Sequence, residues 1–167
     1  MSHKAHRAAA GATFTCIHCR QGVALTSWGT RHRNHCPYCL YSRHVDWKEV
    51  GDRLAVCRAE MQPIGLVLKA TRKKYGMARD GELMLVHLCR ECGKVSLNRL
   101  AADDDPERVW EIFESSFERL DEHLLSVELG EITLLPRSES ELVETQLFGK
   151  RPFRLVSIED NVSTNVL

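Results

Sequence analysis

The chain has 167 residues, 43% of them hydrophobic, and its 23 basic and 23 acidic residues give a formal net charge of zero. This apolar content excludes an intrinsically disordered chain, and the absence of any run approaching 18 apolar residues excludes a membrane-spanning helix. The charge is unevenly distributed, since residues 1–100 hold 17 Lys and Arg against 7 Asp and Glu, whereas residues 101–167 hold 6 against 16.

In chain order, the sequence predicts a short flexible tail over residues 1–12 and then a β-rich domain over residues 13–105. Inside that domain, the apolar runs 64–70 and 82–88 predict the two strands of a β-hairpin, joined by the loop 71–81. The second strand leads directly into a cluster of metal-ligating residue types.

A change of pattern after residue 102 predicts a helical, acidic extension over residues 106–154. Asp105 and Pro106 fit an N-cap and a first helical position. Apolar residues then recur at i, i+3 and i+4 spacing, which predicts an amphipathic helix of about five turns. They are Val109, Ile112, Phe113, Phe117, Leu120 and Leu124.

Three weaker elements complete the expected chain. Residues 131–135 predict a short strand that ends at Pro136. Ser138 and Glu141 fit the cap of a short helix through Leu147. Residues 155–167 are expected to form a flexible tail.

Seven cysteines are present, and six of them form three Cys-x-x-Cys pairs. An odd count does not suit a closed disulfide framework, and the first 30 residues contain no apolar region of the secretory type. We therefore expect a cytoplasmic, reducing environment, where repeated Cys-x-x-Cys pairs usually indicate a metal site.

The first two pairs, Cys16/Cys19 and Cys36/Cys39, are separated by 16 residues, which is the spacing of zinc ribbons. Two tight turns, each aiming two sulfur atoms at one point, complete a tetrahedron around Zn²⁺. The alternative is a redox-active dithiol, but that motif requires a strand–helix context that the polar flanks do not provide.

The third pair belongs to a second cluster, in which His87 stands close to Cys89 and Cys92. Cys57 is the expected fourth ligand of a Cys₃His site, and His44 or His35 could substitute for His87 or Cys57. An interleaved pairing, with Cys16/Cys19 joined to the third pair, stays open at this stage. The sequence predicts two zinc ions. The fold class is therefore a small α+β fold of zinc-ribbon-like β-hairpins with Cys-x-x-Cys knuckles, followed by a C-terminal amphipathic helix.

A family resemblance rests on the stretch Arg33-Asn34-His35-Cys36-Pro37 and the residues that follow it through Asp46. Together with Cys57, the His87–Gly93 cluster and residues 98–104, this stretch resembles the RNHCP-domain family over about residues 12–105. The resemblance implies a cytoplasmic, zinc-ribbon-like domain.

Catalytic motifs are missing from the sequence. There is no His-Glu-x-x-His, no nucleophile elbow, no phosphate-binding glycine loop and no zinc-deaminase signature. Closed four-ligand zinc shells are structural, so we expect a non-catalytic protein. A zinc-dependent hydrolase returns as an alternative only if Cys57 is not a ligand.

The basic half predicts contact with RNA or the ribosome, because arginine and lysine neutralise phosphates and the interleaved aromatic residues stack on bases. The residues expected in this contact are Arg31, Arg33, Arg43, Arg72, Lys73, Lys74, Tyr75 and Arg79. Arg33 and Asn34 could instead brace the knuckle through hydrogen bonds. The alternative function is a protein-interaction adaptor that uses the acidic helical extension over 106–154.

Overall fold

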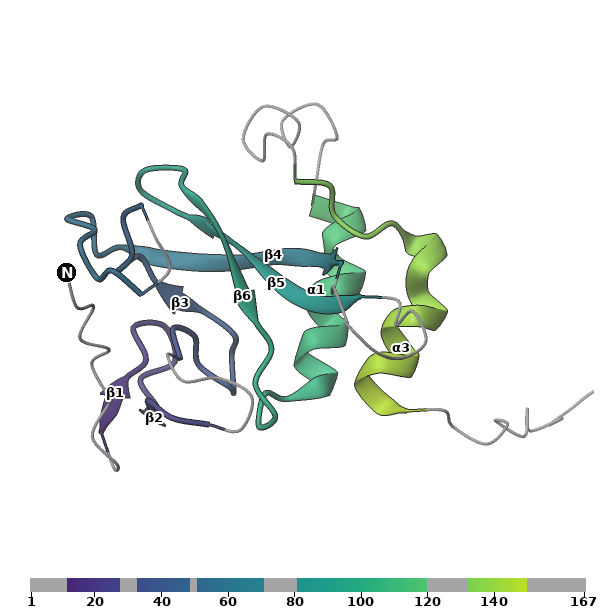
Figure 1. Ribbon diagram of the computed structural model, residues 1–167, viewed down its shortest axis with the longest axis horizontal. Coiled ribbons are helices and arrows are strands. Elements are labelled where there is room, and N and C mark those ends of the chain that lie inside the picture. The colour runs from purple at the N-terminus through teal and green to yellow at the C-terminus, as the bar shows by residue number, and fades with distance from the viewer. Residues whose placement is uncertain (1–11, 28–32, 49–50, 71–80, 120–131, 150–167) are drawn as a thin grey trace, which may run out of the picture.

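The computed structural model describes residues 12–27, 33–48, 51–70, 81–119 and 132–149. The described residues form a two-stranded sheet and a four-stranded sheet, and Figure 1 shows a pair of helices at one end of the larger sheet. The small sheet pairs β1 (Thr13–Thr15) with β2 (Gly22–Ala24). The fold is α+β, as predicted.

The larger sheet is antiparallel throughout, with strand order β3-β4-β5-β6. Its strands are β3 (Ser42–Arg43), β4 (Glu60–Lys69), β5 (Glu82–Cys89) and β6 (Val95–Arg99). The β4–β5 hairpin confirms the predicted pair of strands, and β3 and β6 extend it on either side. The predicted loop between the hairpin strands lies almost wholly outside the described residues.

Both faces of this sheet are apolar, because successive side chains of a strand point to opposite faces. One face contributes Leu66, Leu83 and Leu85 to the main core, together with Val109 and Phe113 of the first helix. The other face carries a smaller cluster around Met84 and Val86. Residues such as Leu85 and Val86 are therefore both fully buried although they are neighbours in the chain.

Helix α1 (Pro106–Arg119) begins where the sequence predicts. The Asp105 carboxylate caps it, accepting hydrogen bonds from the backbone N–H groups of Glu107 at 3.1 Å and Arg108 at 3.4 Å. Its apolar stripe packs on β4, so the described part of the acidic extension shares one core with the strands. Leu120 and Leu124 of the predicted stripe lie outside the described residues.

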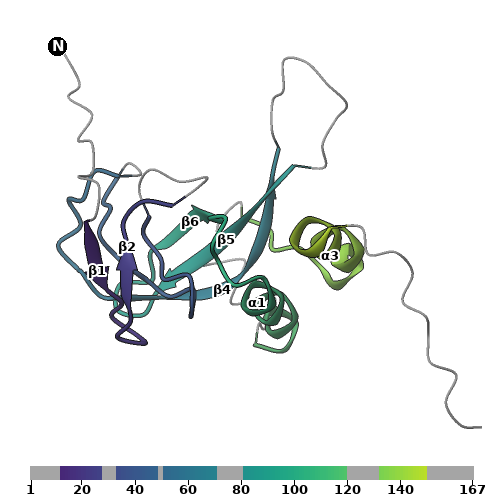
Figure 2. The same cartoon turned by 90° about the horizontal axis from the view of Figure 1, so that it is seen from below.

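The second helical element begins with a 3₁₀ turn, η1 (Arg137–Glu139), and continues as α3 (Ser140–Phe148). This confirms the short predicted helix but corrects its cap, because Ser138 lies inside the 3₁₀ turn and Glu139 holds the N-cap position of α3 without a side-chain hydrogen bond. Helix α3 packs beside α1, with the rings of Trp110 and Phe148 6.4 Å apart, and both views show the two helices together at one end of the hairpin (Figures 1 and 2).

The strand predicted over 131–135 is a correction, because residues 132–136 form no strand. The segment does run along the free edge of β4, where the backbone N–H of Leu135 donates to the carbonyl of Leu66 at 2.8 Å. Gly65 makes this approach possible, since a Cβ at that position would lie only 2.8 Å from Leu134 Cδ1. One bond of this kind covers a strand edge without adding a strand.

Residues 1–11 of the predicted N-terminal tail and the whole of the predicted tail 155–167 lie outside the described residues. Within the described part of the chain, neither helix has the length and apolar character needed to cross a membrane.

Candidate metal centres

The three Cys-x-x-Cys pairs have the same backbone geometry. In each, the N–H four residues after the first cysteine donates to the carbonyl of that cysteine, at 3.2 Å for Arg20, 2.9 Å for Leu40 and 3.1 Å for Gly93. In each, the N–H of the first cysteine donates back to a carbonyl five residues later. This closed pattern turns both sulfur atoms toward the same side of the loop.

The residue after the second cysteine adopts a positive φ in every pair: 66° at Arg20, 61° at Leu40 and 70° at Gly93. The sequence pointed to this only at Gly93, because glycine adopts such angles without strain. Arg58, which follows Cys57, also has a positive φ of 55°. Non-glycine residues held in this region are costly, which is typical of loops shaped for a ligand.

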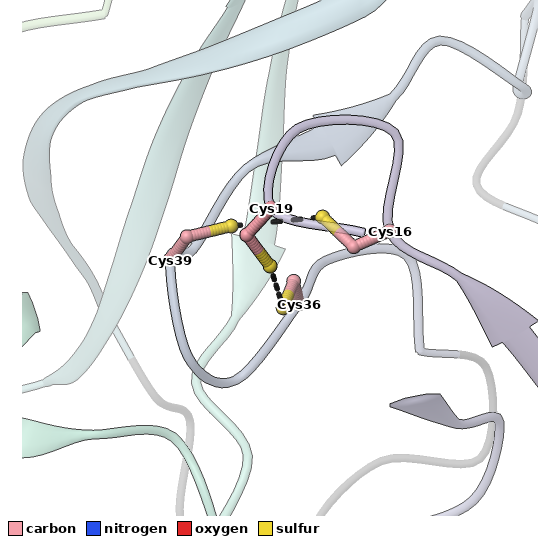
Figure 3. Close-up of side chains that lie close together, drawn as sticks. All are labelled: Cys16, Cys19, Cys36 and Cys39. Atoms are coloured by element: carbon pink, nitrogen blue, oxygen red, sulfur yellow. Dashed lines mark hydrogen bonds between the residues drawn. The ribbon is translucent and has the colours of Figure 1, made fainter. Parts of the chain in front are cut away.

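The first two knuckles converge, and Cys16, Cys19, Cys36 and Cys39 form one group whose sulfur atoms lie within 4.8 Å of one another (Figure 3). Cys16 Sγ lies 3.6 Å from Cys39 Sγ, and Cys19 Sγ lies 3.5 Å from Cys36 Sγ. These distances exclude disulfides, whose sulfur atoms are about 2 Å apart. They approach the edge of about 3.8 Å of a tetrahedron with Zn–S bonds of about 2.3 Å.

When no metal is bound, neighbouring thiols of this group have pKa values shifted in opposite directions. Burial raises the pKa of the Cys36 thiol to about 11, with the Cys19 and Cys16 thiols adding to the rise and backbone N–H groups opposing it. For Cys19, burial acts upward, but hydrogen bonds from the Gln21 backbone and the other three thiols outweigh it and lower the pKa. A dication bound by the deprotonated thiols would remove these opposing shifts.

The third knuckle forms the second group with Cys57 and His44. Cys57 Sγ lies 3.7 Å from Cys89 Sγ, and His44 Nδ1 lies 3.3 Å from Cys92 Sγ. Cys57 thus takes the place expected for it. The interleaved pairing that the sequence left open does not occur, because Cys16/Cys19 joins Cys36/Cys39 and the third knuckle joins Cys57 and His44.

His87 is a correction, since the structure places His44, and not His87, among the second set of ligand atoms. The His87 ring is fully buried, and both nitrogens are engaged: Nε2 donates to the Leu40 carbonyl at 2.7 Å, and Nδ1 accepts from Asn98 at 2.9 Å. Burial lowers the pKa of His87 to about 3, so the ring is neutral. Through the Leu40 carbonyl, His87 supports the second knuckle, Cys36/Cys39.

The sheet register explains why His44, and not His87, joins the second group. Ser42 pairs with Met61, and Met61 pairs with Cys89, so three distant segments meet in one row. His44, two residues beyond Ser42, is carried to the third knuckle. His35, the other substitute that the sequence allowed, makes a buried contact with Asp104 instead.

Each group offers four ligand atoms of the types that zinc prefers, Cys₄ in one case and Cys₃His in the other. Each could therefore hold one zinc ion, in agreement with the predicted two.

A family model of the RNHCP domain matches residues 11–110. The chain belongs to this family. No curated protein and no solved structure matches the sequence.

The five residues that spell the family's name attach the first metal group to the rest of the RNHCP domain. Arg33 is 2% exposed, and its Nη2 donates to the carboxylate of Asp103. His35 Nε2 lies 2.7 Å from Asp104 Oδ2, and both side chains are buried. The carbonyl of Pro37 accepts from the N–H of Asp105, the cap of α1, at 3.1 Å.

The remaining signature residue, Asn34, donates from Nδ2 to Asp46 Oδ2 at 3.0 Å. Asp46 in turn accepts from the backbone N–H groups of Gly51 and Arg53 and so shapes the loop that leads toward Cys57. The RNHCP signature thus links the first metal group to helix α1 and to the second metal group.

The acidic run Asp103-Asp104-Asp105 immediately precedes helix α1. Asp105 caps the helix. Asp103 accepts a hydrogen bond from Arg33, and Asp104 contacts His35. Burial would raise the pKa of Asp103, yet the hydrogen bonds from Arg33 and Ser27 lower it. The sequence gave no signal of this pairing, because the partners lie 70 and 69 residues apart in the chain.

Of the residues predicted to touch nucleic acid, Arg33 donates from a buried guanidinium to Asp103, which is the bracing role that the sequence left open for it. Arg43 is exposed. The other six, which are Arg31, Arg72, Lys73, Lys74, Tyr75 and Arg79, lie outside the described residues.

Proposed function

We propose that this protein is a non-catalytic, zinc-stabilised RNA-binding protein, and that it contacts RNA, including ribosomal RNA, through one basic face of its RNHCP domain. The observation that supports this is a shallow depression of about 360 Å³ between residues 42–48 and strand β6. We call it the lysine face. Its basic and aromatic lining residues are Arg43, Trp47, Lys48, Lys69 and Lys94.

The lysine face combines the two kinds of group that single-stranded nucleic acid requires. Trp47 is 50% exposed and offers a surface for base stacking, while Lys48 and Lys94 are exposed and can neutralise phosphates. Lys94 Nζ also donates to the Trp47 carbonyl at 2.7 Å, which fixes the Trp47 segment beside β6.

Acidic groups do not cancel this charge. The one acidic residue among the described lining residues is Asp46, whose carboxylate already accepts hydrogen bonds from Asn34, Gly51 and Arg53. Two zinc ions with seven thiolates contribute about −3, so residues 1–100 keep a net charge of about +7. The lobe that carries the lysine face therefore still attracts a polyanion.

The two alternatives have weaker support. A docking helix would present an apolar stripe, but Val109 and Phe113 of α1 are fully buried in the core of the same chain. A hydrolytic zinc keeps an open coordination position, whereas the second group supplies four protein ligands.

Fluorescence anisotropy with a labelled single-stranded RNA of mixed sequence tests the proposal on the zinc-loaded full chain. Trp47→Ala should weaken binding about tenfold, because one stacked base contributes about 1–3 kcal/mol. Lys48→Gln should weaken it less and make the salt dependence shallower by about 0.7 in log–log slope, as expected for one lost phosphate contact.

Arg108→Gln is the matched control, since Arg108 is an exposed basic residue on α1, away from the lysine face, paired with Glu111. It should leave RNA affinity unchanged. Equal weakening by Arg108→Gln and Lys48→Gln, or no binding at about 50 mM salt where contacts of this kind are strongest, would overturn the proposal.

A further inference from the structure

A second depression, of about 400 Å³, adjoins the lysine face, because Asn34, Ser42, Arg43 and Val45 line both. It lies between the first knuckle and residues 41–45 and is lined by four arginines: Arg20, Arg33, Arg43 and Arg53. No acidic residue is among its described lining residues. We call it the arginine cleft.

Three of the four arginines are available to a ligand, since Arg33 is buried and already paired with Asp103. Arg20 and Arg43 are exposed, and neither forms an ion pair within the described part of the chain. Arg53 Nε lies 3.8 Å from Asp46 Oδ1, a long contact that leaves most of its donors unused. The cleft also includes Cys16, whose thiolate charge the guanidinium groups outweigh in number.

Two residues that line this cleft each have one buried polar atom without a partner among the described residues. Arg33 donates a hydrogen bond from Nη2 to Asp103, but its Nε is buried without an acceptor. Asn34 Oδ1 is buried without a donor. The amide orientation of Asn34 is fixed, because its nitrogen faces the carboxylate of Asp46 at 3.0 Å.

The two unpaired atoms differ in kind, because Arg33 Nε is a hydrogen-bond donor and Asn34 Oδ1 is an acceptor. The guanidinium groups of Arg20, Arg43 and Arg53 can donate to an oxyanion, for which phosphate is the best geometric match, and Arg33 Nε lacks an acceptor. Asn34 Oδ1 requires a hydroxyl or amine donor close to that anion. Buried polar groups left unpaired are costly, so a ligand that supplies both is favoured.

We infer that the arginine cleft binds a ribose phosphate unit, with the phosphate among the arginines and a ribose hydroxyl donating to Asn34 Oδ1. Ribose phosphate carries both groups a few bonds apart, and a volume of about 400 Å³ suits a nucleotide. The inference extends the proposed RNA binding, because a strand on the lysine face would place its next ribose phosphate in the adjoining cleft. It also gives a means to distinguish RNA from DNA through a 2′-hydroxyl.

Binding of uridine 5′-monophosphate to the zinc-loaded full chain, followed by amide chemical shifts and calorimetry, tests the inference. We expect saturable binding with shifts near Thr15, Arg20 and Ser42. Affinity should fall several-fold for 2′-deoxyuridine 5′-monophosphate, and binding of uridine, which lacks the phosphate, should be undetectable. Binding of uridine equal to that of its monophosphate, or of inorganic phosphate equal to that of the nucleotide, would overturn it.

Arg20→Gln should weaken uridine monophosphate binding about tenfold, since it removes a charge-assisted contact. Arg53→Gln is a second variant with the same expected direction. Arg108→Gln is the matched control, because Arg108 is an exposed arginine on α1 that does not line the arginine cleft. Two zinc ions per chain must be retained in every variant, and an unchanged nucleotide affinity in correctly folded Arg20→Gln would overturn the inference.

The same variants separate this inference from the proposed function. If Trp47→Ala weakens RNA binding but the nucleotide does not bind, the arginine cleft is excluded and RNA binding stands. If the nucleotide binds and Arg20→Gln weakens it while RNA does not bind, the cleft stands and its ligand is a free nucleotide.

Discussion

The two metal groups share one knuckle geometry but lie in different surroundings. In the Cys₄ group, Cys16 and Cys36 are buried and pack with Val23 in a small cluster of their own. In the Cys₃His group, Cys57 and Cys92 are exposed, and Cys89 ends a strand of a sheet that has two apolar clusters. Zinc in the Cys₄ group therefore takes the place of a hydrophobic core. Zinc in the Cys₃His group lies beside a sheet that already has its own apolar core.

This difference follows from element length. Strands β1 and β2 have three residues each, too few to bury an apolar face, whereas β4 and β5 have ten and eight. A structural zinc contributes about 10–16 kcal/mol to the folding of small domains, which is comparable with the whole stability of a typical protein.

The largest effect is expected when one ligand of each group is replaced. Cys36→Ser should remove one zinc and unfold the β1–β2 lobe, at a cost on the order of 10 kcal/mol. Cys57→Ser should also remove one zinc but leave the sheet folded. Amide hydrogen exchange with elemental analysis measures both. Equal loss of protection over residues 13–25 in the two variants would show that the metal groups do not differ in this way.

The second prediction separates the two histidines near the third knuckle. His44→Ala should lower the zinc content from two ions to one. His87→Gln should keep two ions but lower the free energy of unfolding by about 1–3 kcal/mol, because Leu40 and Asn98 lose a buried partner. Zinc analysis and denaturant unfolding provide the readouts. Zinc loss in His87→Gln with full retention in His44→Ala would contradict the assigned shell.

The third prediction concerns the rate of zinc release to a chelator. Two exposed ligands should let the Cys₃His group lose its ion at least about tenfold faster than the buried Cys₄ group, since less structure must open. A chromogenic chelator should therefore report two phases. Cys57→Ser should abolish the fast phase only, and a single phase in the unaltered protein would count against the comparison.

The smallest effect is expected at the contact between the first group and α1. Asp103→Asn should cost less than about 1 kcal/mol, because the Asp103 side chain is 53% exposed and water screens its pairing with Arg33. Asp104→Asn should cost more, since Asp104 is 2% exposed and contacts buried His35. Thermal unfolding of the zinc-loaded variants measures the order, and a reversed order would exclude the buried pair as the stronger link.

The sequence by itself determined the elements that depend on local spacing. The three knuckles were predictable because each closes through hydrogen bonds within six residues. Helix α1 was predictable because it begins at a capping residue and its apolar residues recur with the helical period. Cys57 was predictable only by elimination, as the remaining thiol.

Only the tertiary structure decided which histidine completes the second group, that Arg33 is buried, and that residues 132–136 line a strand edge without joining the sheet. Each depends on segments far apart in the chain, such as the row Ser42–Met61–Cys89 that brings His44 to Cys92, or the pairing of Arg33 with Asp103. The physical reason is that burial and strand register are set by the packing of the whole domain, and sequence spacing records only what a short stretch of backbone can do alone.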